Sequence, residues 1–161
     1  MDGCAQRLAG EDRVIRAFLL VVACAAVADV GRAAADAVPG GALSVRLLGL
    51  RNDHGRAGCL LFGSEKGFPK DPGAALQKVW CAINHGETTC RFDPTRAGVY
   101  AVACFHDENG NGKLDTGLFG IPKEATAASN DAKGTMGPPK FNDAKFSFPG
   151  RGMQLRLHVG Y

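Results

Sequence analysis

The sequence has few of the motifs that enzymes and nucleic-acid-binding proteins commonly carry. Its four histidines include no His-x-x-x-His pair and it has no Gly-x-Ser-x-Gly segment, so neither a zinc site nor a serine nucleophile is indicated. The basic residues occur singly, without a run or stripe, which argues against nucleic-acid binding. Long apolar runs are missing too: the run at 17–28 has 12 residues, whereas a membrane-spanning helix needs about 20.

This short apolar run predicts an export signal. Arg13 and Arg16 precede it, and an Ala-Asp-Ala triplet before Val38 forms a small-x-small cleavage site. We therefore expect residues 1–37 to be a signal peptide and leader. Residues 38–161 are expected to form a single periplasmic or secreted domain without a transmembrane span.

Two other interpretations of the leader stay open. Glu11 and Asp12 add negative charge before the apolar run, which is unusual for a signal peptide. In the first alternative the run is a buried helix or a membrane anchor. Cys24 follows a lipobox-like triplet, which is typical of a lipoprotein, although the apolar run continues past this cysteine.

The expected mature chain is long enough to bury one core without help. It carries 15 Lys/Arg and 11 Asp/Glu residues, a net charge of +4. This weak, scattered charge favours an unknown envelope protein or a small ligand as partner, and not nucleic acid.

Short segments of alternating or continuous apolar character follow the leader at the spacing of strands, with turn residues between them and almost no helical periodicity. The sequence therefore predicts an all-β fold, a seven-stranded antiparallel Greek-key β-sandwich of immunoglobulin-like or transthyretin-like type with one long ordered loop. The first two strands and the third and fourth strands are each expected to form a hairpin. The seven predicted strands are 42–52, 57–64, 78–84, 88–92, 98–106, 144–148 and 153–159.

The expected mature chain keeps four cysteines, and an even number in an exported domain indicates disulfides. Pairing the strands around the turn 84–87 places Cys81 opposite Cys90, at a distance that suits a disulfide. Cys59 and Cys104 remain on two other strands, where they either form a second bridge or stay as small buried apolar groups. Four reduced, buried cysteines are the alternative, which export disfavours.

About 36 residues without clear periodicity separate the strands at 98–106 and 144–148. The segment holds many apolar residues, which a disordered loop would lack. We therefore expect it to fold back over one end of the sandwich. Its apolar members are Leu114, Leu118, Phe119, Ile121, Met136 and Phe141.

The start of this loop, "DENGNGKLD", has the spacing of a calcium-binding loop. Oxygen-bearing residues fall at positions one, three, five and nine, Gly112 occupies the sharp turn at position six, and a backbone carbonyl is available at position seven. Leu118 stands where a bidentate glutamate belongs, so any calcium affinity should be weak. The candidate ligands are Asp107, Asn109, Asn111, Lys113, Asp115 and Glu124.

Two alternatives apply to the same loop. Asp and Asn side chains followed by glycine also form Asx-turns that need no metal, because they accept hydrogen bonds from nearby backbone N–H groups. His106 with neighbouring carboxylates is a candidate for acid–base catalysis, yet His106 and Asp107 are adjacent on a strand and should point to opposite faces. Outside the loop, Trp80 alternates out of the apolar set of its strand and is either a ligand platform or ordinary packing.

The segment "YAVACFHDENGNGKLDTGLFGIPKEATAASN", followed by "GPPKFNDAKFSF" and a final strand, resembles the bacterial secreted domain-of-unknown-function family 2141. The opening "LSVRLLGLRNDHGRAGCLLFGSEKGFP" is similar to the start of that family, so the resemblance spans about 42–161. It implies an exported β-sandwich and no established activity, and its motif does not include the cysteines.

These patterns favour a non-enzymatic periplasmic or envelope binding or accessory module, with a weak calcium loop at 107–124. One alternative is a small enzyme that uses the loop 106–124 as its active site. Another is a structural interaction domain of a cell-surface assembly.

Overall fold

The computed structural model describes residues 41–161, apart from the side chain of Pro94. The predicted leader therefore lies outside the described residues. The strands are β1 (Gly41–Leu48), β2 (Arg56–Phe62), β3 (Gln77–Cys81), β4 (Glu87–Thr95), β5 (Gly98–Asp107), β6 (Thr126–Ala128), β7 (Phe146–Phe148) and β8 (Met153–His158). Three helical turns, η2 (Leu118–Gly120), η3 (Ser129–Asp131) and α1 (Phe141–Ala144), lie between β5 and β7. Within this part of the chain no helix is long and apolar enough to cross a membrane.

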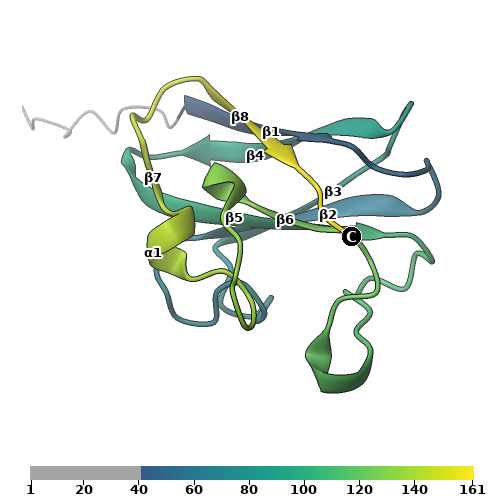
Figure 1. The fold of residues 1–161 in the computed structure, drawn as a ribbon. Helices are drawn as coiled ribbons and strands as arrows, with labels where there is room; N and C mark the ends of the chain where they lie inside the picture. The colour runs from purple at the N-terminus through teal and green to yellow at the C-terminus, as the bar shows by residue number, and fades with distance from the viewer. Residues whose placement is uncertain (1–40) are drawn as a thin grey trace, which may run out of the picture. The chain divides into compact units, whose positions relative to one another are not determined.

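The strands form two sheets (Figure 1). One has the order β4-β1-β8, and the other has the order β3-β2-β5-β6, with β7 paired to β5. Strand alternation gives the three-stranded sheet one apolar face, as in β1, where Leu43, Val45 and Leu47 are fully buried and the residues between them are not. These residues pack in one core with side chains of the second sheet such as Leu61 and Val102.

The prediction of seven antiparallel strands was wrong in two respects. The described chain has eight strands, because Thr126–Ala128 in the long loop pairs with β5. In addition, β1 runs parallel to β8. A parallel neighbour is possible here because the chain makes many other passes between β1 and β8, so no tight turn has to connect them.

The two predicted hairpins were also wrong. β1 and β2 lie in different sheets, and so do β3 and β4. In the link after β1, Leu50 is buried and donates its N–H to the carbonyl of Gly86, and the chain then crosses to the other sheet. The turn predicted at 84–87 is present, with Asn84 bridged to Glu87, but beyond it the two strands separate into the two sheets.

The predicted pair Cys81–Cys90 is joined as a disulfide, and so are Cys59 and Cys104, for which a bridge was one of two alternatives. Cys59 and Cys104 are directly opposed on β2 and β5, with Cα atoms 4.2 Å apart. Cys81 and Cys90 have Cα atoms 5.6 Å apart, but their bridge links β3 of one sheet to β4 of the other. One bridge therefore reinforces a sheet and the other holds the two sheets together.

The two sheets differ in their outer faces. The three-stranded sheet presents polar side chains outward, among them Arg46, Arg91 and Arg156, which are not buried. The five-stranded sheet has an apolar outer face, where Leu60, Phe62 and other residues are covered by the loops 63–76 and 129–145. The long loop after β5 projects on this second side (Figure 1).

Candidate functional site: the loop 107–124

The loop begins at Asp107, the last residue of β5, whose side chain is fully buried. Its Oδ2 accepts a hydrogen bond from the N–H of Gly112 at 2.9 Å and from Nε of Arg56 at 3.3 Å. Gly112 has φ +79°, a conformation that favours a residue without Cβ. Asp107 thus closes the turn and ties it to β2.

Two overlapping Asx-turns continue the loop. The side-chain oxygen of Asn109 accepts the N–H of Asn111 at 3.0 Å, and that of Asn111 accepts the N–H of Lys113 at 2.8 Å. The amide nitrogens of both asparagines donate to the carboxylate of Asp115, at 2.7 and 3.0 Å. The alternation of Asn and Gly in the sequence therefore builds a turn held by side-chain acceptors.

Glu124 joins the two ends of this turn. It is only 6% exposed, and its Oε1 accepts the N–H of Glu108 at 3.0 Å while Oε2 accepts the N–H of Asp115 at 2.9 Å. Both carboxylate oxygens are thus used by the backbone, and Glu124 supports the loop as a hydrogen-bond acceptor.

Residues 115–123 form a narrow arm, in which the chain runs out and back. The N–H of Lys123 bonds to the carbonyl of Asp115 at 2.9 Å, and the N–H of Gly117 bonds to that of Ile121 at 2.7 Å. The tip is η2, whose side chains are not buried against the domain. The expectation that the loop folds back over one end of the sandwich was therefore wrong for this arm. Of the six apolar residues named for the loop, only Phe141 packs against the buried apolar clusters.

The structure brings the six predicted calcium ligands into one small region, but most of their oxygens already accept N–H groups. Among residues 41–161, no three or more His, Cys, Asp or Glu side chains come together in a way that could hold a metal ion. One atom departs from this pattern: Oδ1 of Asp107 is buried and has no hydrogen-bond partner among the described residues.

His106 is fully buried beside the loop and holds the chain end in place. Its Nε2 lies 2.8 Å from the carbonyl oxygen of His54, which can only accept, so Nε2 carries the proton. In the neutral ring Nδ1 then accepts from the Tyr161 hydroxyl at 3.3 Å. Both ring nitrogens of His106 thus contact protein groups. Neither contacts Asp107, which accepts hydrogen bonds from Arg56 and Gly112.

A charged pair covers this histidine. Nη2 of Arg51 donates to Oε2 of Glu108 at 2.9 Å, and Nε lies 2.8 Å from Oε1, although it is not aligned for a hydrogen bond. The Arg51 guanidinium also stacks 4.5 Å from the centre of the Tyr161 ring. The hydrogen bond from Arg51 lowers the pKa of the Glu108 carboxyl below its ordinary value, against the opposing effect of burial.

This shift predicts a loss of stability in acid. Because the pKa of Glu108 is lower in the folded than in the unfolded chain, its stabilising effect is complete above about pH 4.3, the ordinary value, and is lost as the pH falls through the folded pKa. We expect Glu108→Gln to be less stable than wild type in urea unfolding at pH 7, with a difference that shrinks as the pH is lowered below about 4.3. A difference that stays constant as the pH is lowered would contradict this assignment.

Sequence reasoning did not anticipate a second cluster, on the outer face of the five-stranded sheet. The Arg56 guanidinium lies 4.0 Å from the Trp80 ring centre, and Trp80 meets Phe105 edge to face at 5.5 Å. Gly58 lies between them, where a Cβ would come within 2.7 Å of Trp80 and 2.8 Å of Phe105. A glycine inside a strand was the available signal, since it often marks a close approach of this kind. Trp80 is thus packed and still 42% exposed.

The fold and this site define a two-sheet β domain with two disulfides and an ordered loop that is held by side-chain hydrogen bonds. A family model described as "Uncharacterized protein conserved in bacteria (DUF2141)" matches residues 45–155. The chain belongs to this family, domain-of-unknown-function family 2141. Neither the curated proteins nor the solved structures contain a match to the chain.

Proposed function

We propose that the protein is an exported, non-enzymatic binding module of the bacterial envelope, a Greek-key sandwich of immunoglobulin-like or transthyretin-like type whose loop 107–124 is organised by weakly bound calcium. Its place of action is the periplasm or the cell exterior. Two disulfides support export, since such bridges persist in oxidising compartments.

The observation that carries the calcium proposal is the unpartnered Oδ1 of Asp107. A buried carboxylate oxygen without a partner is costly, and an ion or an ordered water relieves that cost. The side-chain oxygens of Asn109 and Asn111 each have a second lone pair, since an amide oxygen can accept twice. The positive charge of Arg56 next to Asp107 opposes a cation, which fits the millimolar affinities of extracellular modules.

The enzyme alternative has less support. A general base needs a free nitrogen or oxygen directed at the substrate, but both ring nitrogens of His106 face protein groups and its ring is fully buried. Both carboxylate oxygens of Glu124 accept backbone N–H groups, and Oε2 of Glu108 accepts from Arg51. Oε1 of Glu108 is buried without a hydrogen bond, 2.8 Å from Nε of Arg51 and 3.6 Å from Nδ1 of His106, so it does not face a substrate. The site is therefore better suited to holding a shape than to transferring protons.

Calcium should raise the melting temperature of the wild type and not that of Asp107→Ala. With a dissociation constant of about 1 mM, about 5 mM calcium adds roughly 1 kcal/mol to the free energy of unfolding, or a few degrees of melting temperature. The measurement is a thermal melt in calcium and in chelator.

Asp53→Ala is the matched control, because Asp53 is an exposed carboxylate that also accepts two backbone N–H groups, those of His85 and Gly86. It should lose stability without losing the response to calcium. Equal melting temperatures of the wild type in calcium and chelator would refute the calcium proposal.

A further inference from the structure

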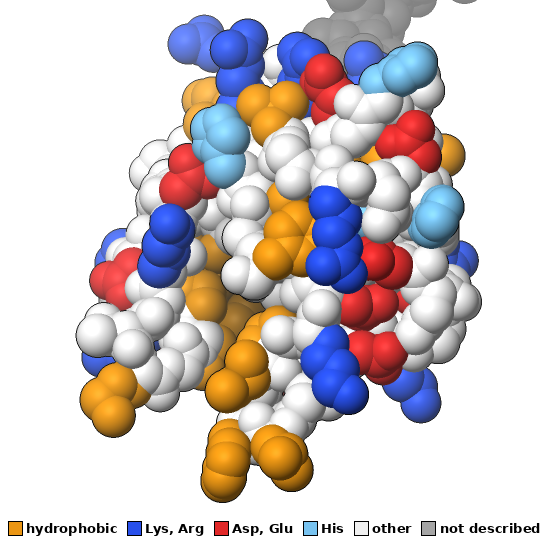
Figure 2. Space-filling model, turned by 45° about the vertical axis from the view of Figure 1, so that its right-hand side comes forward, with side chains coloured by type: hydrophobic (Ala, Val, Ile, Leu, Met, Phe, Trp, Pro, Cys, Tyr) orange, Lys and Arg blue, Asp and Glu red, His pale blue; other side chains and the backbone are white. Residues whose placement is uncertain are grey.

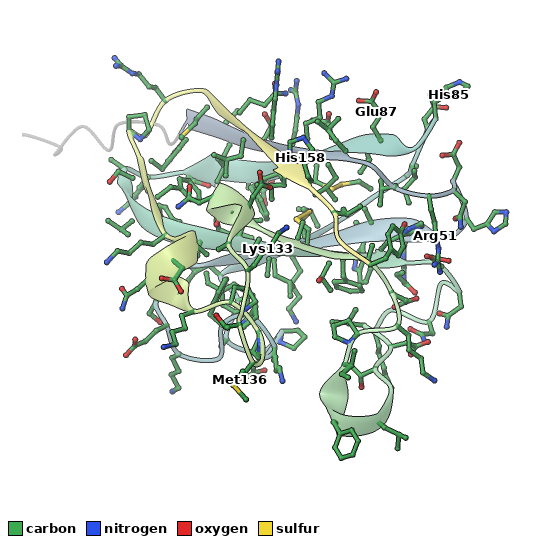
Figure 3. The ribbon with its side chains drawn as sticks, viewed as in Figure 1. Arg51, His85, Glu87, Lys133, Met136 and His158 are labelled. Atoms are coloured by element: carbon green, nitrogen blue, oxygen red, sulfur yellow. A yellow bond between two sulfur atoms is a disulfide. The ribbon has the colours of Figure 1, made fainter. Side chains whose placement is uncertain are left out.

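Two projections on the outer side of the five-stranded sheet, where the loops lie, end in exposed apolar side chains. Leu118, Phe119 and Ile121 on the arm are 83%, 98% and 64% exposed, and Met136 on the loop after η3 is 100% exposed. We call these four residues the apolar tips. Met136 stands at the end of a loop that projects to the same side as the arm (Figure 3), and Figure 2 shows apolar side chains at the ends of both projections and in the hollow between them.

The arm holds its tip in a defined shape. Thr116 is bridged to Pro122 and the N–H of Gly120 bonds to the carbonyl of Gly117, while Glu124 fixes the base of the arm. Phe119 has φ 62°, a left-handed conformation that is uncommon for a bulky residue. Hydrogen bonds and an uncommon backbone conformation thus present an aromatic ring that contacts little of its own domain.

The charges within the two segments that carry the apolar tips have one sign, although Asp131, which pairs with His158, and Asp143 flank the second segment. The two tip segments, 116–123 and 132–140, contain three lysines and no aspartate or glutamate. Lys123 is exposed at the base of the arm, and Lys140 follows the second tip. Lys133 lies at the base of the second loop (Figure 3). The nearest acidic groups of the arm are directed inward, since Glu124 is buried and Asp115 is held by Asn109 and Asn111.

Lysine occurs in only two stretches of the sequence. The eight lysines all fall within 66–78 and 113–145, whereas the three-stranded sheet carries arginines and no lysine. Lysine has a long apolar stem with a charged end, which suits a position just behind an apolar group at a lipid interface.

We propose that the apolar tips insert into the headgroup region of an anionic lipid bilayer and dock the loop side of the domain onto it. The apolar tips lie on two separate projections, and lysines follow them. The headgroup region of a bilayer can deform around such projections, and anionic lipids attract the lysines. A protein partner would be indicated by a central pocket or by Trp and Arg anchors, and the tip segments contain neither residue. The inference rests on the proposed binding module and names the surface that it binds.

Vesicle sedimentation of the full chain tests this proposal. Vesicles containing about one quarter phosphatidylglycerol should bind the wild type at low salt, with weaker binding in high salt and to pure phosphatidylcholine. The double variant Leu118→Ser, Phe119→Ser should bind at least about tenfold more weakly. All variants retain residues 1–40, so any binding by the apolar run 17–28 is equal among them.

The charge contribution has a matched control. Changing Lys123, Lys133 and Lys140 to glutamine should weaken binding to the anionic vesicles several-fold, whereas changing Arg91, Arg151 and Arg156 to glutamine removes the same charge and should have little effect. Phe119→Trp should keep binding, and its emission should shift to the blue when vesicles are added, beyond the change given by Trp80 in the wild type.

Unchanged binding of the double serine variant, or unchanged emission of Phe119→Trp, would overturn the proposal. A larger mass in light scattering that the serine variant abolishes, without vesicle binding by the wild type, would overturn it in favour of a second copy of this chain. The calcium melt contains no lipid, so a failure there leaves the vesicle result standing and the reverse also holds.

Discussion

Replacing Cys59 and Cys104 together by alanine is expected to lower the free energy of unfolding by about 4 kcal/mol. The bridge joins residues 45 positions apart, and closing a loop of that length removes this much conformational entropy from the unfolded chain. Both side chains are buried, with 0% and 3% exposure, so the shortened side chains leave part of the core unfilled and add to the loss.

The bridge between Cys81 and Cys90 provides the comparison. It closes only 9 positions, so the corresponding double alanine variant should lose about 2.5 kcal/mol. Urea unfolding of the wild type and both variants without reductant measures the two effects. A larger loss from the Cys81–Cys90 pair would show that holding the two sheets together in the folded state outweighs the entropy of the unfolded chain.

The cysteines also show what the sequence can predict about the fold. Alternation places Cys81 and Cys90 on the inner faces of their strands, and the turn at 84–87 brings the strands together. Those two facts suit a pair within one hairpin and a pair across two sheets equally well. The choice between them depends on which other strand each one pairs with, β2 for β3 and β1 for β4.

The alternation of apolar and polar residues predicted which face of a strand is buried, but it did not predict which strands pair. The pattern of β8, with Leu157 buried and Arg156 and His158 exposed, predicts a strand with one buried face, and the structure has it. The same pattern contains no information about direction, so the parallel pairing of β8 with β1 could not be predicted from it. The short β6 was missed because three residues are too few to show a period.

In the loop, hydrogen bonds between residues close in sequence could be predicted, whereas contacts between distant residues could not. Asn109 and Asn111 form the Asx-turns that their spacing indicates, because each bonds two residues ahead. Glu124 was predicted as a calcium ligand, yet in the structure it accepts N–H groups 16 and 9 positions before it. Which apolar residues would be buried also depended on distant contacts, as Phe141 is packed and Phe119 is not.

Glu124 offers the second large effect, because a single buried carboxylate organises the whole arm. Glu124→Ala removes both acceptors and leaves the N–H groups of Glu108 and Asp115 without partners. A hydrogen bond to a charged group contributes about 1.5–3 kcal/mol, so the loss of two should destabilise the loop locally by about 3 kcal/mol or more. Amide hydrogen exchange at Glu108 and Asp115 should then accelerate by at least about 100-fold.

Two further variants make this test specific to the carboxylate. Glu124→Gln keeps the shape and one acceptor, and should accelerate exchange at only one of the two amides. Lys123→Ala changes the exposed neighbour, whose backbone bond to Asp115 is retained, and should leave exchange at both amides as in the wild type. Unchanged exchange at both amides in Glu124→Ala would contradict the role of Glu124, and so would uniform acceleration throughout the domain, because the arm would then unfold only with the core. Acceleration confined to 108–123 would show that one side chain holds the arm, and with it the apolar tip, in the shape that binding requires.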